Sequence, residues 1–158
     1  MRILFAAALA AISLLATAGS ALACTCAYQT AEQQLQASDR VFSGIVLAVE
    51  TVEGTYGEIR RAVVQVREIW KGESERRVVV DTTPTATCTL ILELGQNYLI
   101  YADRSEEEGV YWTHECKRTR LRDHADADVV KLGDPLFIVS SGAQSWGAVK
   151  ARFVAGDF

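Results

Sequence analysis

The sequence predicts a mainly β domain of five strands flanked by two short helices, with an N-terminus fixed by disulfides. Three observations lead to this prediction: period-two hydrophobic alternation recurs along the chain, turn residues separate the alternating segments, and four cysteines follow an apolar N-terminal region. The chain has 158 residues and a formal net charge of −4. No basic stretch dominates, which argues against a nucleic-acid partner. No later segment is long and apolar enough to span a bilayer.

Residues 1–23 have the organisation of a secretory signal peptide. Arg2 precedes an apolar run, and Ala21-Leu22-Ala23 has the small-x-small pattern of a cleavage site. We therefore predict a secreted or periplasmic protein that begins at Cys24, carries a formal charge of −5 once Arg2 is removed, and is long enough for one domain with its own core. The alternative is a lipoprotein acylated at Cys24, although Ala21 stands where a lipid-attachment motif prefers leucine.

The mature chain contains four cysteines: Cys24, Cys26, Cys88 and Cys116. Export favours disulfides, and four cysteines allow three pairings. A bond between Cys24 and Cys26 would close a strained ring, so the sequence favours the two pairings that join both N-terminal cysteines to distant partners. A zinc site of four thiolates is the alternative. Structural zinc sites usually have short spacings at both ends, however, and Cys88 and Cys116 lie 28 residues apart.

Two helices are expected. The first covers residues 31–37, with Thr30 as N-cap and Gln33 in capping-box position. The second covers residues 123–132 and ends before Gly133.

Hydrophobic alternation predicts five strands, at residues 41–52, 59–70, 77–82, 98–102 and 110–113. The first strand is apolar on both faces, which is typical of a central or strongly curved strand, and Gly44 permits a bend in it. The polar segment 83–88 contains Pro84 and is expected to form a loop that ends at Cys88.

Five strands, two helices and no internal repeat are typical of the five-stranded OB-fold barrel. The domain is expected to cover residues 24–133, and residues 134–158 form a C-terminal tail whose role the sequence leaves open. Trp70 and Trp112 fall in strands and are expected in the core, whereas Trp146 lies in the tail.

An enzymatic site is not expected, and no cofactor is predicted. The histidines are His114 and His124, and no cysteine is expected to be free, so a nucleophile and a base cannot be assembled. We interpret His114 as a solvated neighbour of the Cys116 disulfide rather than a metal ligand. His124 is expected on a polar helix face, in surface ion pairs with the nearby aspartates: Asp123, Asp126 and Asp128.

An ordered set of short motifs gives a resemblance to a known family. These motifs are Cys24-Thr25-Cys26, Ser38-Asp39-Arg40-Val41-Phe42-Ser43-Gly44, Glu68-Ile69-Trp70-Lys71-Gly72, Cys88, Gly95-Gln96-Asn97-Tyr98-Leu99-Ile100-Tyr101 and Cys116. Together they resemble the netrin-like domain of the tissue inhibitors of metalloproteinases, and more closely bacterial secreted proteins of that type. The resemblance covers residues 24–133. It implies an OB-type barrel and two disulfides, Cys24 with Cys88 and Cys26 with Cys116.

The resemblance also implies a function for the N-terminus. In those inhibitors the α-amine and carbonyl oxygen of the first cysteine chelate the zinc of a metalloproteinase, and the next side chain enters its specificity pocket. These roles fall on Cys24 and Thr25, and the implied partner is a secreted zinc metalloproteinase. The sequence departs from the family in lacking the proline that soon follows the second cysteine and the cysteines of a third disulfide or second domain. The alternative is a cell-envelope structural or adaptor domain, with or without a lipid anchor, in which the cysteines only staple the terminus.

Overall fold

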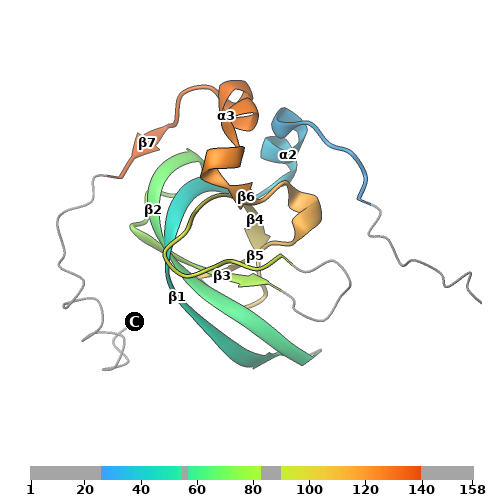
Figure 1. The fold of residues 1–158 in the computed structure, drawn as a ribbon, viewed down its shortest axis with the longest axis vertical. Coiled ribbons are helices and arrows are strands. Elements are labelled where there is room, and N and C mark those ends of the chain that lie inside the picture. Colours follow the sequence, from blue (N-terminus) through green and yellow to red (C-terminus); the bar gives the residue numbers. More distant parts are fainter. Residues whose placement is uncertain (1–25, 55–56, 83–89, 140–158) are drawn as a thin grey trace, which may run out of the picture.

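The computed structural model describes residues 26–54, 57–82 and 90–139, and it is built mainly of β-strands (Figure 1). Five strands close into a ring in which the neighbours run β1-β2-β3-β5-β4 and β4 pairs again with β1. The pairing of β3 with β5 is parallel, and the other ring pairings are antiparallel. The mainly β prediction is confirmed. The strands are β1 (Arg40–Gly54), β2 (Gly57–Lys71), β3 (Arg77–Thr82), β4 (Asn97–Arg104) and β5 (Val110–Trp112).

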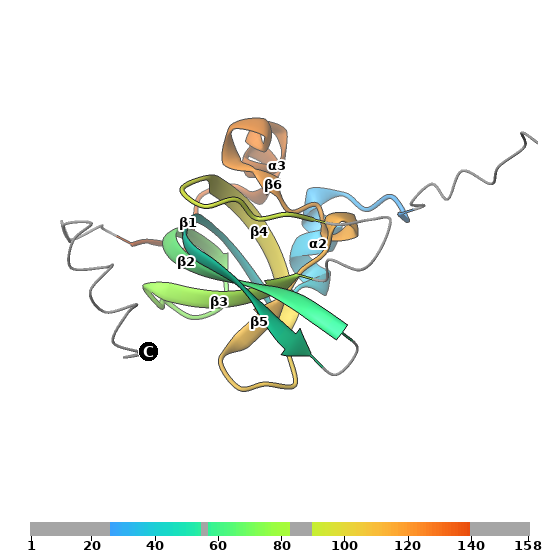
Figure 2. The same cartoon turned by 60° about the horizontal axis from the view of Figure 1, so that its bottom comes forward.

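Two short helices, α2 (Ala31–Ala37) and α3 (Asp126–Leu132), lie together against one end of the ring in both views (Figures 1 and 2). The bounds of α2 are those predicted, and its capping box is formed: Gln33 N donates to Thr30 Oγ1 at 3.2 Å, and Thr30 N donates to Gln33 Oε1 at 2.9 Å. No helix among the described residues has the length and apolar character needed to cross a membrane.

The second helix begins at Asp126 rather than at residue 123. Residues Arg122–His124 form a separate 3-10 turn, η2, and Ala125, whose φ is −110° and ψ 10°, interrupts the helical path between the two. Ala125 also has no side-chain group that could cap the helix. The helix ends before Gly133, as predicted.

The chain continues past the predicted domain boundary as part of the sheet. Strand β7 (Phe137–Ile138) pairs with β2, supported by hydrogen bonds from Leu136 N to Ile69 O at 2.7 Å and from Val139 N to Arg67 O at 2.8 Å. A further short strand, β6 (Arg120–Leu121), pairs with β4. The first residues of the expected tail therefore pack along β2. The rest of the tail, including Trp146, lies outside the described residues.

Strand β1 is apolar on both faces because it separates two cores. Phe42 and Val46 belong to the core inside the ring. Val41 points the other way, into a second cluster on which the helices pack through Leu35 and Val129. Burial on both faces explains the near-continuous apolar sequence of this strand. The members of the second cluster are Val41, Trp70, Leu99, Tyr101 and Ala125.

Gly44 lies where β1 approaches β2 too closely for a side chain. The register between the two strands shifts between Ser43 and Gly44. A Cβ atom on Gly44 would lie 2.6 Å from Gln65 O and 2.6 Å from Val64 Cγ1, well inside van der Waals contact. The position predicted to permit a bend is thus one that requires glycine.

The two strand tryptophans have different environments. Trp70 is 5% exposed and donates its Nε1–H to Gly133 O at 2.8 Å, so its predicted core position is confirmed. The same prediction for Trp112 is wrong, because this side chain is 40% exposed. In the short strand β5, Tyr111 packs into the ring core and the next residue therefore projects from the outer face.

Candidate functional site

A disulfide between Cys26 and Cys116 fixes the first residues that the structure describes. The two Cα atoms are 5.2 Å apart, and 90 residues separate the cysteines in sequence. This pairing is the one implied by the family resemblance, and it excludes a zinc site of four thiolates. Cys24, Thr25 and Cys88 lie outside the described residues, so the second expected disulfide and the two expected contact residues stay predictions.

Arg118 holds the segment that follows the disulfide. Its Nη1 donates to Gln29 O at 2.8 Å, while Nε donates to Asp128 Oδ2 at 3.0 Å and Nη2 to Asp128 Oδ1. The Asp128 side chain is almost fully buried, and its hydrogen bonds and charge raise the pKa of Arg118. We call the Cys26–Cys116 disulfide, Arg118, Asp128 and Gln29 the N-terminal anchor. It joins the N-terminal segment, η1 (Glu115–Lys117) and α3 through one disulfide and the bonds of the Arg118 side chain.

The backbone of Arg118 has an unfavourable conformation that the contacts of the anchor maintain. This residue follows η1 with a φ of 62°, and it is the one non-glycine residue with positive φ in the described part of the chain. Such a conformation is unfavourable for a residue with a Cβ atom and persists where surrounding contacts determine it. The contacts here are the bonds of the Arg118 side chain to Gln29 and Asp128.

Arg118→Ala is expected to lower the free energy of unfolding by about 3 kcal/mol, because it leaves the buried Asp128 carboxylate with only Arg120 Nε, 4.0 Å away, as a counter-charge. Urea denaturation measures this change. Arg104→Ala is the matched control: Arg104 is 70% exposed and pairs with Glu73 at 3.8 Å, so its loss should change stability by less than about 0.5 kcal/mol. Equal effects of the two substitutions would show that the buried Asp128 carboxylate does not need the charge of Arg118 for stability.

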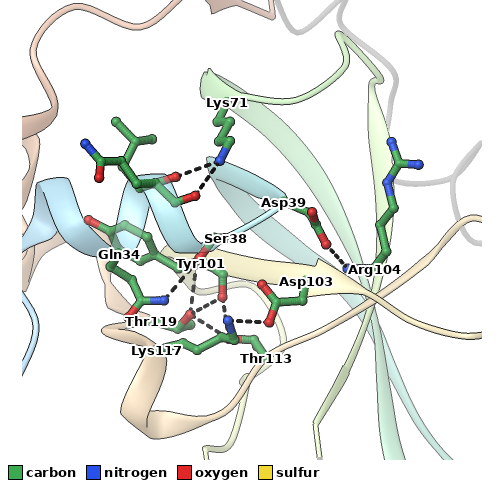
Figure 3. Close-up of polar contacts among 12 residues, drawn as sticks. Gln34, Ser38, Asp39, Lys71, Tyr101, Asp103, Arg104, Thr113, Lys117 and Thr119 are labelled. Carbon is green, nitrogen blue, oxygen red and sulfur yellow. Dashed lines mark hydrogen bonds and ion pairs between the residues drawn. The ribbon is translucent and has the colours of Figure 1, made fainter. Parts of the chain in front are cut away.

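The loop that carries Cys116 is tied to β4 on both sides of the cysteine (Figure 3). Before it, Thr113 Oγ1 donates to Tyr101 O at 2.7 Å. After it, Thr119 Oγ1 accepts from Tyr101 N at 3.0 Å and lies 2.8 Å from the Thr113 hydroxyl. Lys117 forms an ion pair with Asp103. The sulfur of Cys116 is therefore presented from a loop whose two ends are fixed to the same strand.

Helix α2 is fixed to the sheet by the lysine that ends β2. Lys71 Nζ donates to Leu35 O at 3.0 Å and to Gln36 O at 2.9 Å, which satisfies carbonyl groups at the helix C-terminus (Figure 3). Two residues after the helix, Asp39 Oδ2 accepts a hydrogen bond from Arg104 N in β4 at 2.8 Å. The N-terminal segment thus enters a helix that is itself held in place.

His114 is less solvated than the sequence predicted. Its ring stacks on Trp112 with centroids 5.1 Å apart and an interplanar angle of 20°. Partial burial is the main cause of a lowered pKa of His114, and the nearby charge of Lys117 lowers that pKa further. Within the described ranges, no group of three or more His, Cys, Asp or Glu side chains is arranged to hold a metal ion.

Stability is expected to fall as the pH drops below about 6.5, the ordinary imidazole pKa. The pKa of His114 is lowered in the folded protein, so the unfolded chain binds the proton first on acidification. The stabilisation is therefore complete above about pH 6.5 and is lost as the pH falls through the folded-state pKa. Thermal unfolding between pH 8 and pH 5 should show this slope in the wild type and in His124→Asn, and a smaller slope in His114→Asn. Identical slopes in all three proteins would contradict the assignment.

The ion pairs expected for His124 are made by other residues. Asp128 is buried against Arg118, and Asp126 Oδ1 accepts from Arg122 Nη1 at 3.2 Å. His124 is exposed. Because it belongs to η2 rather than to α3, it does not share a helical face with Asp128.

The residues of the anchor were largely missed by sequence reasoning. One signal was available, because Lys117 and Arg118 directly follow Cys116 and two threonines flank it at 113 and 119. Nothing in the local pattern, however, pairs Arg118 with an aspartate in a helix or with a carbonyl 89 residues earlier. Taken together, the site is a short N-terminal segment that the Cys26–Cys116 disulfide and the Arg118 side chain join to η1 and α3.

No protein-family model and no curated protein sequence matches this chain.

Proposed function

We propose that the chain is a secreted protein-binding module of the netrin-like type, whose mature N-terminus inhibits a zinc metalloproteinase. The observation that carries the proposal is the Cys26–Cys116 disulfide, which fixes the segment two residues after the proposed first residue. The closed ring of five strands with two flanking helices supports the OB-type barrel of the proposal.

The inhibitory chemistry requires only backbone groups at Cys24. The α-amine nitrogen and the carbonyl oxygen of one residue close a five-membered chelate ring on zinc and displace the attacking water from the open coordination position. An α-amine titrates near pH 8, so its deprotonation on binding costs little at neutral pH. Thr25 supplies a small side chain for the adjacent specificity pocket.

The N-terminal anchor supports this chemistry by limiting the freedom of the terminus. Two peptide units separate Cys24 from Cys26, which gives the amine a reach of roughly 7 Å from a fixed point. The hydrogen bond from Arg118 to Gln29 and the capping box of α2 hold the following residues. Binding to a protease then costs less conformational entropy than it would for a free terminus.

Inhibition assays test the proposal directly. The exported protein is titrated against a panel of secreted zinc metalloproteinases, with a secreted serine protease as control. Stoichiometric inhibition of at least one zinc enzyme and of no serine protease is the expected result. Failure to inhibit any zinc enzyme would favour the structural or adaptor function, in which the disulfides only stabilise the fold.

The exported protein is expected to begin at Cys24, to contain two disulfides and to have no free thiol. The cleavage pattern at Ala21-Leu22-Ala23 and the even number of cysteines motivate this prediction. Intact mass and thiol labelling without reduction measure it. A diacylglycerol on the Cys24 sulfur would contradict the Cys24–Cys88 bond, and an acyl group on the Cys24 nitrogen would block the α-amine and contradict the proposed inhibition. A labelled thiol would contradict a protein with two disulfides.

A further inference from the structure

A hollow of about 860 Å³ lies on the outer face of the sheet. One wall is the end of the β1–β2 hairpin, with Val52, Glu53 and Ile59. The lining also includes the connection from β4 to β5, with Glu106 and Glu107. The hollow is therefore lined by the ends of β1 and β2, by the β4–β5 connection and by strand residues between them.

The floor is a row of side chains on neighbouring strands. Arg61 pairs with Asp81 in the β2–β3 register, and Asp81 pairs with Trp112 in the β3–β5 register. The Arg61 guanidinium binds both oxygens of Asp81 at 2.9 Å and reaches Glu107 Oε2 at 2.6 Å. These contacts raise the pKa of Arg61 and hold the β4–β5 connection over β2. The acidic connection from β4 to β5 is thus attached to the sheet through Glu107, although its glutamates are exposed.

The charge of the hollow is negative. Its lining contains four carboxylates and two guanidinium groups, which gives a formal charge of −2. Arg61 neutralises part of the charge of Asp81 and Glu107, whereas Glu53 and Glu106 are exposed and have no ion pair among the described residues. Arg104, the second guanidinium, is 70% exposed and pairs outward with Glu73. Such a surface repels phosphate and sulfate groups and attracts cations.

The hollow also offers apolar contact. Val52, Ile59 and Trp112 line it. Trp112 is 40% exposed, although its ring also stacks on His114 and lies 5.8 Å from Lys117 Nζ. Carboxylates at the rim of an apolar wall suit a long cationic side chain, because lysine and arginine bury their aliphatic stems while their charged ends stay near water and a counter-charge.

We propose that this hollow binds a basic segment of a partner protein, with the stem of a lysine or arginine against Val52, Ile59 and Trp112 and its charge facing Glu53 and Glu106. Charge complementarity and the preformed walls carry the proposal. This proposal does not depend on Cys24 or on zinc chelation, so it can be tested separately from the proposed inhibition.

The probe for the test is an N-acetylated, C-amidated hexapeptide of lysine and alanine, added to the full mature protein labelled with nitrogen-15. The indole resonance of Trp112, assigned with Trp112→Phe, reports on the hollow. The indole of Trp70 is an internal control, because it is buried and bonded to Gly133 O. Glu53→Gln with Glu106→Gln removes the two unpaired charges. Glu50→Gln with Glu108→Gln is the matched control, since both residues are exposed, have the same charge and do not line the hollow.

The expected result is a saturable shift of the Trp112 resonance with little change at Trp70. The dissociation constant should rise at least fivefold in the Glu53/Glu106 variant and less than twofold in the control variant, and it should rise with added salt. The proposal is overturned if the peptide gives no saturable shift, or if both variants weaken binding equally. It is also overturned if the same peptide with acetylated lysines, or a neutral chito-oligosaccharide, binds as tightly as the basic peptide.

Discussion

With one alanine added ahead of Cys24, the protein is expected to lose roughly a hundredfold or more of its affinity for a susceptible metalloproteinase. The extra residue moves the α-amine away from the zinc while both sulfurs of the N-terminal cysteines stay in place. Loss of a zinc chelate costs several kcal/mol, and each ~1.4 kcal/mol corresponds to a tenfold change in affinity. Inhibition constants of the native and extended forms measure the effect.

Two controls separate chelation from folding and from pocket contacts. The extended form should keep the thermal unfolding temperature of the native form, because the Cys26–Cys116 disulfide and the rest of the N-terminal anchor are unchanged. Thr25→Gly should weaken inhibition less, and unequally across proteases, because it empties only a pocket. Equal inhibition by the native and extended forms would remove the support for chelation.

Replacement of both Cys26 and Cys116 by serine is expected to reduce the free energy of unfolding by ~2 to 5 kcal/mol. The disulfide closes a long loop, since 90 residues separate the two cysteines, and it joins the N-terminal segment to the loop fixed on β4. Denaturation in urea under oxidising conditions measures the change. The hydrogen bond from Arg118 to Gln29 remains possible in the variant, so the domain itself should still fold.

The matched comparison for this variant is a single serine substitution at Thr113, which shortens a buried side chain of the same loop but leaves its hydroxyl contacts possible. Its effect should be smaller than that of the disulfide. Where the double variant still folds, its inhibition should also be weaker than that of the wild type, because the N-terminal segment is less restricted before binding. An unfolding curve identical to that of the wild type would contradict a stabilising disulfide.

The strands and the first helix could be predicted because their signals are local. Ala62, Val64 and Val66 alternate with a set of residues that is mostly polar, which indicates the buried face of β2, and the structure buries these three side chains. The Thr30 and Gln33 pair fixes the start of α2 through hydrogen bonds between residues three apart.

Ring closure and the environment of Trp112 could not be predicted in the same way. The parallel pairing of β3 with β5 joins segments about thirty residues apart, and no pattern within either strand specifies it. A strand of three residues, such as β5, is too short for alternation to show which side faces the core. The exposed position of Trp112 therefore depends on long-range pairing.

The polar contacts of the N-terminal anchor could not be predicted from the sequence for a related reason, since they join residues far apart in the chain. Asp128 looked like one of several acidic residues on a helix surface, and its burial depends on the position of α3 over Arg118. Arg40, at the start of β1, is likewise fully buried, with its guanidinium bonded to Glu75 at 2.7 Å and lying over the Tyr111 ring. Charged residues are mostly exposed, so a sequence alone does not single out the few that are paired inside.

The most direct test of zinc chelation by Cys24 is the spectrum of a susceptible metalloproteinase in which cobalt(II) replaces zinc. The visible absorption of cobalt depends on its coordination number and ligands, so it reports whether the inhibitor binds the metal. One equivalent of the native protein should change the spectrum as an amine nitrogen and a carbonyl oxygen replace water, and the alanine-extended protein should leave it unchanged. Inhibition by the native protein without a change in the cobalt spectrum would contradict chelation through Cys24.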